Sequence, residues 1–182
     1  MQSIKNKPLK QYVKVVIIIL VILALAGIAH AINIKNDNET TTIVLPTKKM
    51  SYHTNIIKDT AENENYRKVL FTGTNSQLVI MSVPPGQDVG KEVHKYTEQT
   101  LFFLSGSGIG ELDGQTFPVG PGDVVVVVPG TEHDFTNTGT TDMKIYTVYA
   151  PKNHIDGRIQ ATKADADADT ADEAIGENPP VK

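Results

Sequence analysis

Three polar side chains in the middle of the chain have the types and spacing of metal ligands. Glu92 and His94 are two residues apart, so in a β-strand both side chains point to the same face. Residues 99–104 predict the returning strand, in which Gln99, Leu101 and Phe103 share a face. If that face meets Glu92 and His94, a carboxylate, an imidazole and an amide oxygen converge against an apolar wall. These donors suit a divalent metal of borderline hardness.

A second histidine lies in a segment farther along the chain. Residues 131–137 alternate in polarity, which places His133, Phe135 and Asn137 on one face of a predicted strand. Two imidazoles and one carboxylate are the donors of a facial triad that leaves coordination positions open. The alternative is a metal-free fold in which the carboxylate, the amide and the imidazoles hydrogen-bond one another, because buried polar groups need partners. We favour the metal site because of its donor types and their spacing.

The sequence around these residues predicts a domain of short β-strands. Runs rich in Val, Ile and Phe are bounded by Gly, Pro and Asn, and they lie at residues 68–72, 77–83, 99–104, 115–119, 124–128, 131–137 and 144–149. Residues 124–128 are five consecutive valines, which predict a strand buried on both faces. Residues 55–60 are expected to form a short irregular cap. The pattern indicates an all-β domain rather than alternating strands and helices.

Two motifs in this region resemble those of the cupin superfamily. The first reads Gly86-x5-Glu92-x-His94-x4-Gln99-x6-Gly106, and the second reads Gly122-x5-Val128-x-Gly130-x2-His133-x3-Asn137. The resemblance covers about residues 55–163 and is to small single-domain cupins, of the type-2 conserved barrel, in a bacterial and archaeal subgroup without an assigned activity. It implies a single jelly-roll β-barrel with a ligand cavity at its centre.

The chain departs from the usual cupin pattern at three positions. Glu92 stands where the family usually has its first histidine, Gln99 stands where it has a glutamate, and the motif proline is displaced by one position to Pro129. The resemblance assigns the metal to Glu92, His94, Gln99 and His133. It leaves the identity of the metal open among Mn, Fe, Ni and Zn.

Two classes of function fit this expectation. One is a non-catalytic module that binds a small molecule, and the other is a metal-dependent enzyme, either a dioxygenase or a sugar-type isomerase. The expected cavity-lining residues are Leu101, Phe103, Phe135 and Asn137, so the wall is predicted to be apolar apart from the metal ligands. The sequence assigns no catalytic residue, and it shows no acid/base pair and no Lys or Arg placed to hold an anion. His154 is expected to fix a loop through a hydrogen bond.

The N-terminus predicts export of the domain. Residues 15–29 are an unbroken apolar run, and the segment 15–34 predicts a transmembrane anchor or a signal segment. Four lysines precede the run and one follows closely, which predicts a cytoplasmic n-region at residues 1–14 and an extracytoplasmic domain. The alternative is a secreted protein cleaved near Ala31, where Ala29-His30-Ala31 fits the cleavage pattern. We favour the retained anchor.

Composition limits the remaining organisation and partners. The 182 residues carry a net charge of −4 and no cysteine, which excludes disulfides and thiolate metal sites and argues against a nucleic-acid partner. The expected partners are a small-molecule ligand and the membrane, and a homodimer stays open. The predicted domain organisation is a polar linker at 35–53, a cupin domain at 54–160 and a solvated acidic tail at 161–182.

Overall fold

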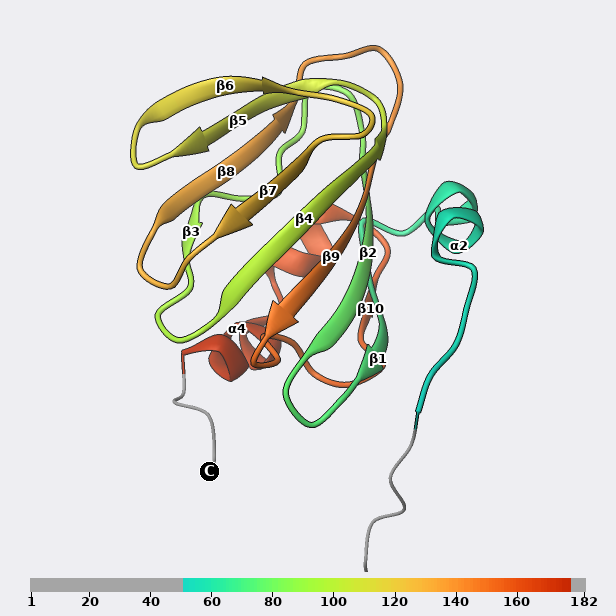
Figure 1. The fold of residues 1–182 in the computed structure, drawn as a ribbon, viewed down its shortest axis with the longest axis vertical. Helices are drawn as coiled ribbons and strands as arrows, with labels where there is room; N and C mark the ends of the chain where they lie inside the picture. Colours follow the sequence, from blue (N-terminus) through green and yellow to red (C-terminus); the bar gives the residue numbers. More distant parts are fainter. Residues whose placement is uncertain (1–50, 178–182) are drawn as a thin grey trace, which may run out of the picture. The chain divides into compact units, whose positions relative to one another are not determined.

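The computed structural model describes residues 51–177, which form two antiparallel β-sheets with short helices beside them (Figure 1). The strands are β1 (Arg67–Thr72), β2 (Gln77–Val83), β3 (Glu92–Val93), β4 (Glu98–Ser105), β5 (Gly108–Leu112), β6 (Gln115–Val119), β7 (Val124–Val127), β8 (Glu132–Asn137), β9 (Met143–Ala150) and β10 (Ile159–Gln160). The helices are α2 (Ile56–Glu62), α3 (Lys163–Asp167) and α4 (Thr170–Gly176). The described region is therefore mostly β, as the sequence predicts.

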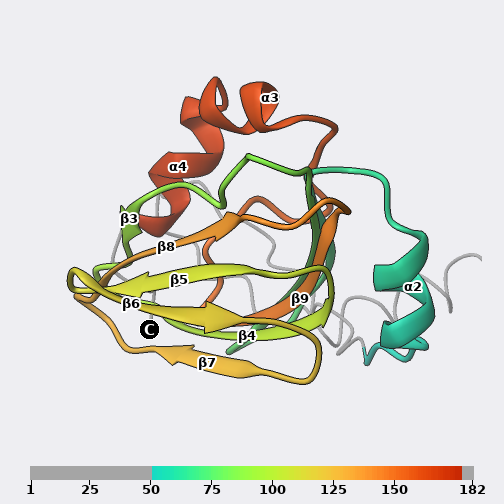
Figure 2. The same ribbon diagram turned by 90° about the horizontal axis from the view of Figure 1, so that it is seen from above.

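The two sheets have the strand orders of a folded-over antiparallel barrel. The six-stranded sheet runs β10-β1-β2-β9-β4-β7, and the four-stranded sheet runs β3-β8-β5-β6. Every pairing between named strands is antiparallel. Figure 2 shows the two sheets stacked around a common interior. Strands distant in sequence, such as β3 and β8, are thereby brought side by side.

Buried and partly exposed side chains alternate along the central strand β9. Met143, Ile145, Thr147 and Tyr149 are fully buried, whereas the residues between them are partly exposed. Because successive side chains of a strand point to opposite faces, this alternation puts one face of β9 into the core and the other outside. The same interior receives residues from both sheets, so one hydrophobic core supports the whole barrel.

A glycine ends β4 where the chain turns sharply towards β5. Gly106 has a φ of 81°, and a Cβ at this position would lie 2.6 Å from the Cα of Met143. Glycine meets both requirements, because it adopts positive φ without strain and leaves room for a neighbouring backbone. The turn holds the end of β4 against the start of β9.

The valine run does not have the burial that the sequence predicts. Val127 of β7 is buried, at 1% exposure, whereas Val124, Val126 and Val128 are 51–54% exposed. The prediction of a strand buried on both faces is wrong because β7 is the edge strand of the six-stranded sheet, and its outer face is open to solvent. A run of apolar residues does not by itself distinguish a covered strand from an edge strand.

Residues 163–176 form helices that pack on the barrel instead of a solvated acidic end. Thr162 caps α3 with a capping box, and the side chain of Asp169 caps α4. Asp172 of α4 is 2% exposed, so an acidic residue of the predicted tail is buried. The expectation of a solvated tail is therefore wrong for Asp172, whereas most other side chains of residues 163–176 are exposed. Figure 2 shows α3 and α4 gathered on one side of the barrel, away from α2.

The segment before the barrel is a helix rather than the irregular cap expected from the sequence. Asn55 accepts a hydrogen bond from the backbone of Lys58 and so begins α2. No helix within residues 51–177 is long and apolar enough to cross a membrane. The predicted n-region, anchor segment and most of the linker lie outside the described residues.

Candidate metal centre and cavity

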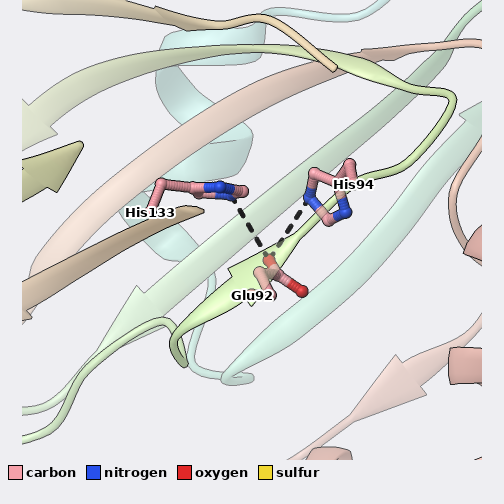
Figure 3. Close-up of side chains that lie close together, drawn as sticks. All are labelled: Glu92, His94 and His133. Carbon is pink, nitrogen blue, oxygen red and sulfur yellow. Dashed lines mark ion pairs between the residues drawn. The ribbon is translucent and has the colours of Figure 1, made fainter. Parts of the chain in front are cut away.

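Three strands bring the predicted metal ligands together. Glu92 in β3 and His133 in β8 are direct register partners, and His94 follows β3 immediately. Gln99 lies near the start of β4, on the same inward face as Leu101 and Phe103. Figure 3 shows the carboxylate of Glu92 between the two imidazole rings. Residues from both predicted motifs therefore meet only because the barrel closes.

The side-chain atoms of these residues converge on one point. Glu92, His94 and His133 each offer a ligand atom within 4.8 Å of the others. Oε1 of Glu92 lies 3.4 Å from Nε2 of His94 and 3.8 Å from Nε2 of His133 (Figure 3). Oε1 of Gln99 lies 3.2 Å from Nε2 of His94 and 3.0 Å from Nε2 of His133. Two imidazoles, a carboxylate and an amide oxygen are a donor set for a divalent metal.

Neighbouring groups fix how two of these side chains face the point. Nδ1 of His133 lies 3.0 Å from the backbone oxygen of Thr131, which accepts its proton. The amide nitrogen of Gln99 donates to the hydroxyl of Tyr149 at 2.9 Å, so its oxygen is turned inward. Such outer hydrogen bonds commonly orient the ligands of metal sites.

The inward nitrogen of His133 is an acceptor that faces other acceptors, because Nδ1 of the neutral ring carries the proton. Burial lowers the pKa of His133, despite the opposing effects of the Thr131 carbonyl and the Glu92 charge, so its neutral form is favoured. In that form Nε2 of His133 carries a lone pair aimed at the oxygen of Gln99, which carries another. Oε1 of Glu92 is buried and, among the residues that the structure describes, has no partner of good hydrogen-bond geometry. A cation at the centre would satisfy these acceptors, so the donor set fits a metal.

The carboxyl group of Glu92 is held ionised. Burial acts to raise its pKa, but the hydrogen bond and charge of His94, with the charges of Arg67 and His133, lower it to about 2. A carboxylate that is ionised at neutral pH is ready to bind a cation without first releasing a proton.

A cavity of about 370 Å³ adjoins this centre, and its wall is not the apolar one that the sequence predicts. Glu92 and His94 line it together with Arg67, Asn153, His154 and Asp172. Nδ1 of His154 lies 2.8 Å from Oδ2 of Asp172, which also makes these two residues a buried acid/base pair. The expectation of no such pair and no basic side chain is therefore wrong.

Sequence reasoning could have found only some of this wall. Arg67 lies on the same inward face of β1 as Val69, so strand alternation places it inside. His154 does fix its loop, because its backbone amide donates to Gln77, but its ring turns to Asp172. Asp172 sits in an Ala- and Asp-rich stretch with no signal that distinguishes it from its neighbours.

The four residues expected to line the cavity lie in the core and are not among those that line it. Leu101, Phe103 and Phe135 are 0–2% exposed, and the rings of Phe103 and Phe135 pack together with centroids 5.4 Å apart. The amide of Asn137 donates to the backbone oxygens of Val83 and Thr141. These four side chains are packed or hydrogen-bonded inside the barrel, so they are not available to contact a ligand in the cavity.

Comparisons with known proteins agree with this architecture. The sequence model of the cupin domain matches residues 79–149. The uncharacterized protein YrkC of Bacillus subtilis is 39% identical over 118 residues, which cover 62% of this chain and 63% of YrkC. The uncharacterized protein L612 of Acanthamoeba polyphaga mimivirus is 32% identical over 116 residues, covering 62% of this chain and 72% of L612. The chain belongs to the cupin family.

A solved structure supports the same assignment. The protein BH2720 of Bacillus halodurans is 31% identical to this cupin, and its crystal structure superposes with a TM-score of 0.64. The match covers 65% of this cupin and 95% of BH2720. The cupin spans slightly less than two thirds of YrkC, so the likeness covers part of that relative's length.

Proposed function

We propose that this cupin binds a divalent metal through Glu92, His94, Gln99 and His133, and holds a small-molecule ligand in the adjoining cavity. One observation carries the proposal: two imidazole nitrogens, a carboxylate oxygen and an amide oxygen converge, and Nε2 of neutral His133 has no proton to give to the oxygens that it faces. The metal, Mn, Fe, Ni or Zn, would supply a Lewis acid with coordination positions left open to the cavity. The protein's part is to orient the ligands and to shape the cavity.

Metal content of purified variants tests the proposal. The full chain in detergent, dialysed against each metal, should retain about one equivalent of at least one of them by elemental analysis. His94→Ala and His133→Ala should each lose it. The wild-type protein should melt at a higher temperature with metal than with chelator, and the two variants should not respond to the metal. Both variants retaining a stoichiometric metal would place the site elsewhere.

A catalytic role is a second candidate, favoured by one feature of the cavity. His154 and Asp172 form a buried pair in the same wall as Glu92 and His94. Burial lowers the pKa of the His154 ring, against the opposing effect of the hydrogen bond that the ring donates to Asp172, and this favours an imidazole that can accept a proton. An enzyme would use this pair as a base beside the metal, whereas a binding module would use it only for contact. Turnover of a ligand that binds, lost in His154→Phe while metal content is unchanged, would distinguish them.

We also propose that this cupin is held at a membrane with its barrel outside the cytoplasm. The support is the apolar run at residues 15–29 and the lysines that precede it. Edman sequencing of the mature protein tests this: an N-terminus at Ile32 would show a secreted protein instead, and an intact N-terminus would support the anchor.

A further inference from the structure

Two buried side chains in the cavity wall have polar atoms without a hydrogen-bond partner among residues 51–177. Nε of Arg67 and Nε2 of His154 are both buried and unpaired, and both residues line the cavity. Arg67 is 9% exposed and His154 is 4% exposed. Unpaired polar groups at this depth are uncommon in folded proteins and usually mark a site that something else completes.

Arg67 has more donors than the protein uses. Its Nη1 reaches Oε1 of Gln160 at a long 3.4 Å and lies 4.0 Å from Oδ2 of Asp172. Asp172 is already engaged, because it accepts from His154 and from the backbone of Ile155. Nε of the guanidinium therefore has no partner among the described residues, and the N–H groups of an arginine match the two oxygens of a carboxylate.

His154 offers a hydrogen-bond acceptor, whereas Arg67 offers donors. Its Nδ1 proton is donated to Asp172, so in the neutral ring Nε2 is an acceptor. The neighbouring Asn153 also has a buried acceptor, Oδ1, without a partner, and it lines the same cavity. Both atoms are acceptors, so a ligand that pairs with them must carry a hydroxyl or another hydrogen-bond donor. Donors for a carboxylate and an acceptor for a hydroxyl thus lie on one wall.

The remaining charges of the wall limit the ligand further. Lys91 lines the cavity, but its ammonium group bonds to Glu111 and Glu132. Asp167, Glu173 and Glu177 line it too, and all three are exposed, so they lie at the rim. A volume of about 370 Å³ admits only a small molecule.

We propose that the cavity binds a small hydroxycarboxylate, with a carboxylate held by Arg67 and a hydroxyl donating to Nε2 of His154. The proposal rests on the proposed function, because the bound metal would neutralise Glu92 and coordinate another oxygen of the same ligand. In this proposal Arg67 and His154 determine which ligand binds, and the metal holds the ligand through a further oxygen.

Calorimetric titration of the manganese-loaded full chain in detergent tests this assignment. The probes are L-malate, succinate, which lacks the hydroxyl, and malamide, which lacks the charges. The wild-type protein should bind malate more tightly than succinate and should bind malamide least. Arg67→Met should weaken malate binding by about tenfold to a hundredfold, the usual worth of charge-assisted hydrogen bonds. His154→Phe should remove the preference for malate over succinate.

Arg158 offers a matched control for the lost charge. It also lies 4.0 Å from Asp172, but it pairs with Asp169 and is not among the residues that line the cavity. Arg158→Met should therefore bind malate as the wild type does. If Arg67→Met fails to fold by circular dichroism, Arg67→Lys replaces it, and its loss of the two-pronged contact should still weaken malate binding.

Elemental analysis of the same samples separates the two proposals. A wild-type protein that holds manganese but binds malamide as well as malate overturns the hydroxycarboxylate site and leaves the metal centre standing. The hydroxycarboxylate site is equally overturned if Arg67→Met, or its Lys replacement, binds malate like the wild type. A wild-type protein that holds no metal of any kind overturns the proposed function, and the hydroxycarboxylate site with it.

Discussion

Replacing Asp172 tests whether the C-terminal helix is part of the domain. Asp172 is 2% exposed, and its two oxygens accept from Nδ1 of His154 at 2.8 Å and from the backbone of Ile155 at 2.7 Å. The pKa of Asp172 lies below its usual range: burial acts to raise it, but the contacts with His154 and Ile155 and the charge of Arg67 outweigh burial. The folded state therefore holds this carboxylate ionised and bonded.

The expected cost of Asp172→Ala follows from those contacts. Each hydrogen bond to an ionised group contributes about 1.5–3 kcal/mol, and the donors left behind are buried. Allowing for the burial cost that the carboxylate itself no longer incurs, we expect a loss of about 3–5 kcal/mol in the free energy of unfolding. Asp172→Asn keeps the shape and one acceptor oxygen, so it should cost less, about 1–2 kcal/mol.

Urea unfolding followed by circular dichroism measures these differences at neutral pH. The neighbouring Glu173 is the control, because it is exposed, and Glu173→Ala should change stability by about 0.5 kcal/mol or less. If Asp172→Ala unfolds at the same urea concentration as the wild type, α4 does not dock on the barrel, and the wall described for the cavity is refuted.

Three further predictions address the barrel, the pH dependence and the metal centre. Val127→Asp should lower the free energy of unfolding by about 4 kcal/mol or more, because it buries an unpaired charge. Val126→Asp lies on the open face and should lower it by about 1 kcal/mol or less. Equal urea midpoints for the two variants would contradict the assigned register. Burial lowers the pKa of His133 and His154 below the ordinary 6.5, so near that pH the folded state binds fewer protons than the unfolded state. The metal-free protein should therefore lose stability as pH falls below about 6.5. Urea midpoints that do not change between pH 7 and pH 5 would contradict this. Gln99→Glu should tighten manganese binding by adding a charged donor, measured by direct titration, and unchanged affinity would remove Gln99 from the ligand set.

The convergence of the candidate metal ligands could be predicted from sequence, whereas the cavity wall could not. Glu92, His94, Gln99 and His133 lie in segments where strand alternation indicates which way a side chain points, and the two motifs that resemble those of cupins assign all four to one site. Strand alternation also points Arg67 inward, but the residues that it contacts, Gln160 and Asp172, lie near the C-terminal end of the described residues. The burial of Asp172 depends on a tertiary contact with His154, and nothing in a stretch of alternating Ala and Asp indicates it. The exposure of the β7 valines could not be predicted for a similar reason, because composition does not say which strand lies at an edge.

The docking of α4 has a consequence for how the domain opens locally. Its buried anchor, Asp172, bonds to His154 and Ile155 in the loop that follows β9. The barrel strands share a large core, while α4 is a seven-residue helix with one buried carboxylate. Segments with few buried contacts open at lower free energy than the core. Amide protons of residues 170–176 should therefore exchange with solvent well before those of β9, and because α4 lines the cavity, this opening would expose the cavity while the barrel stays folded.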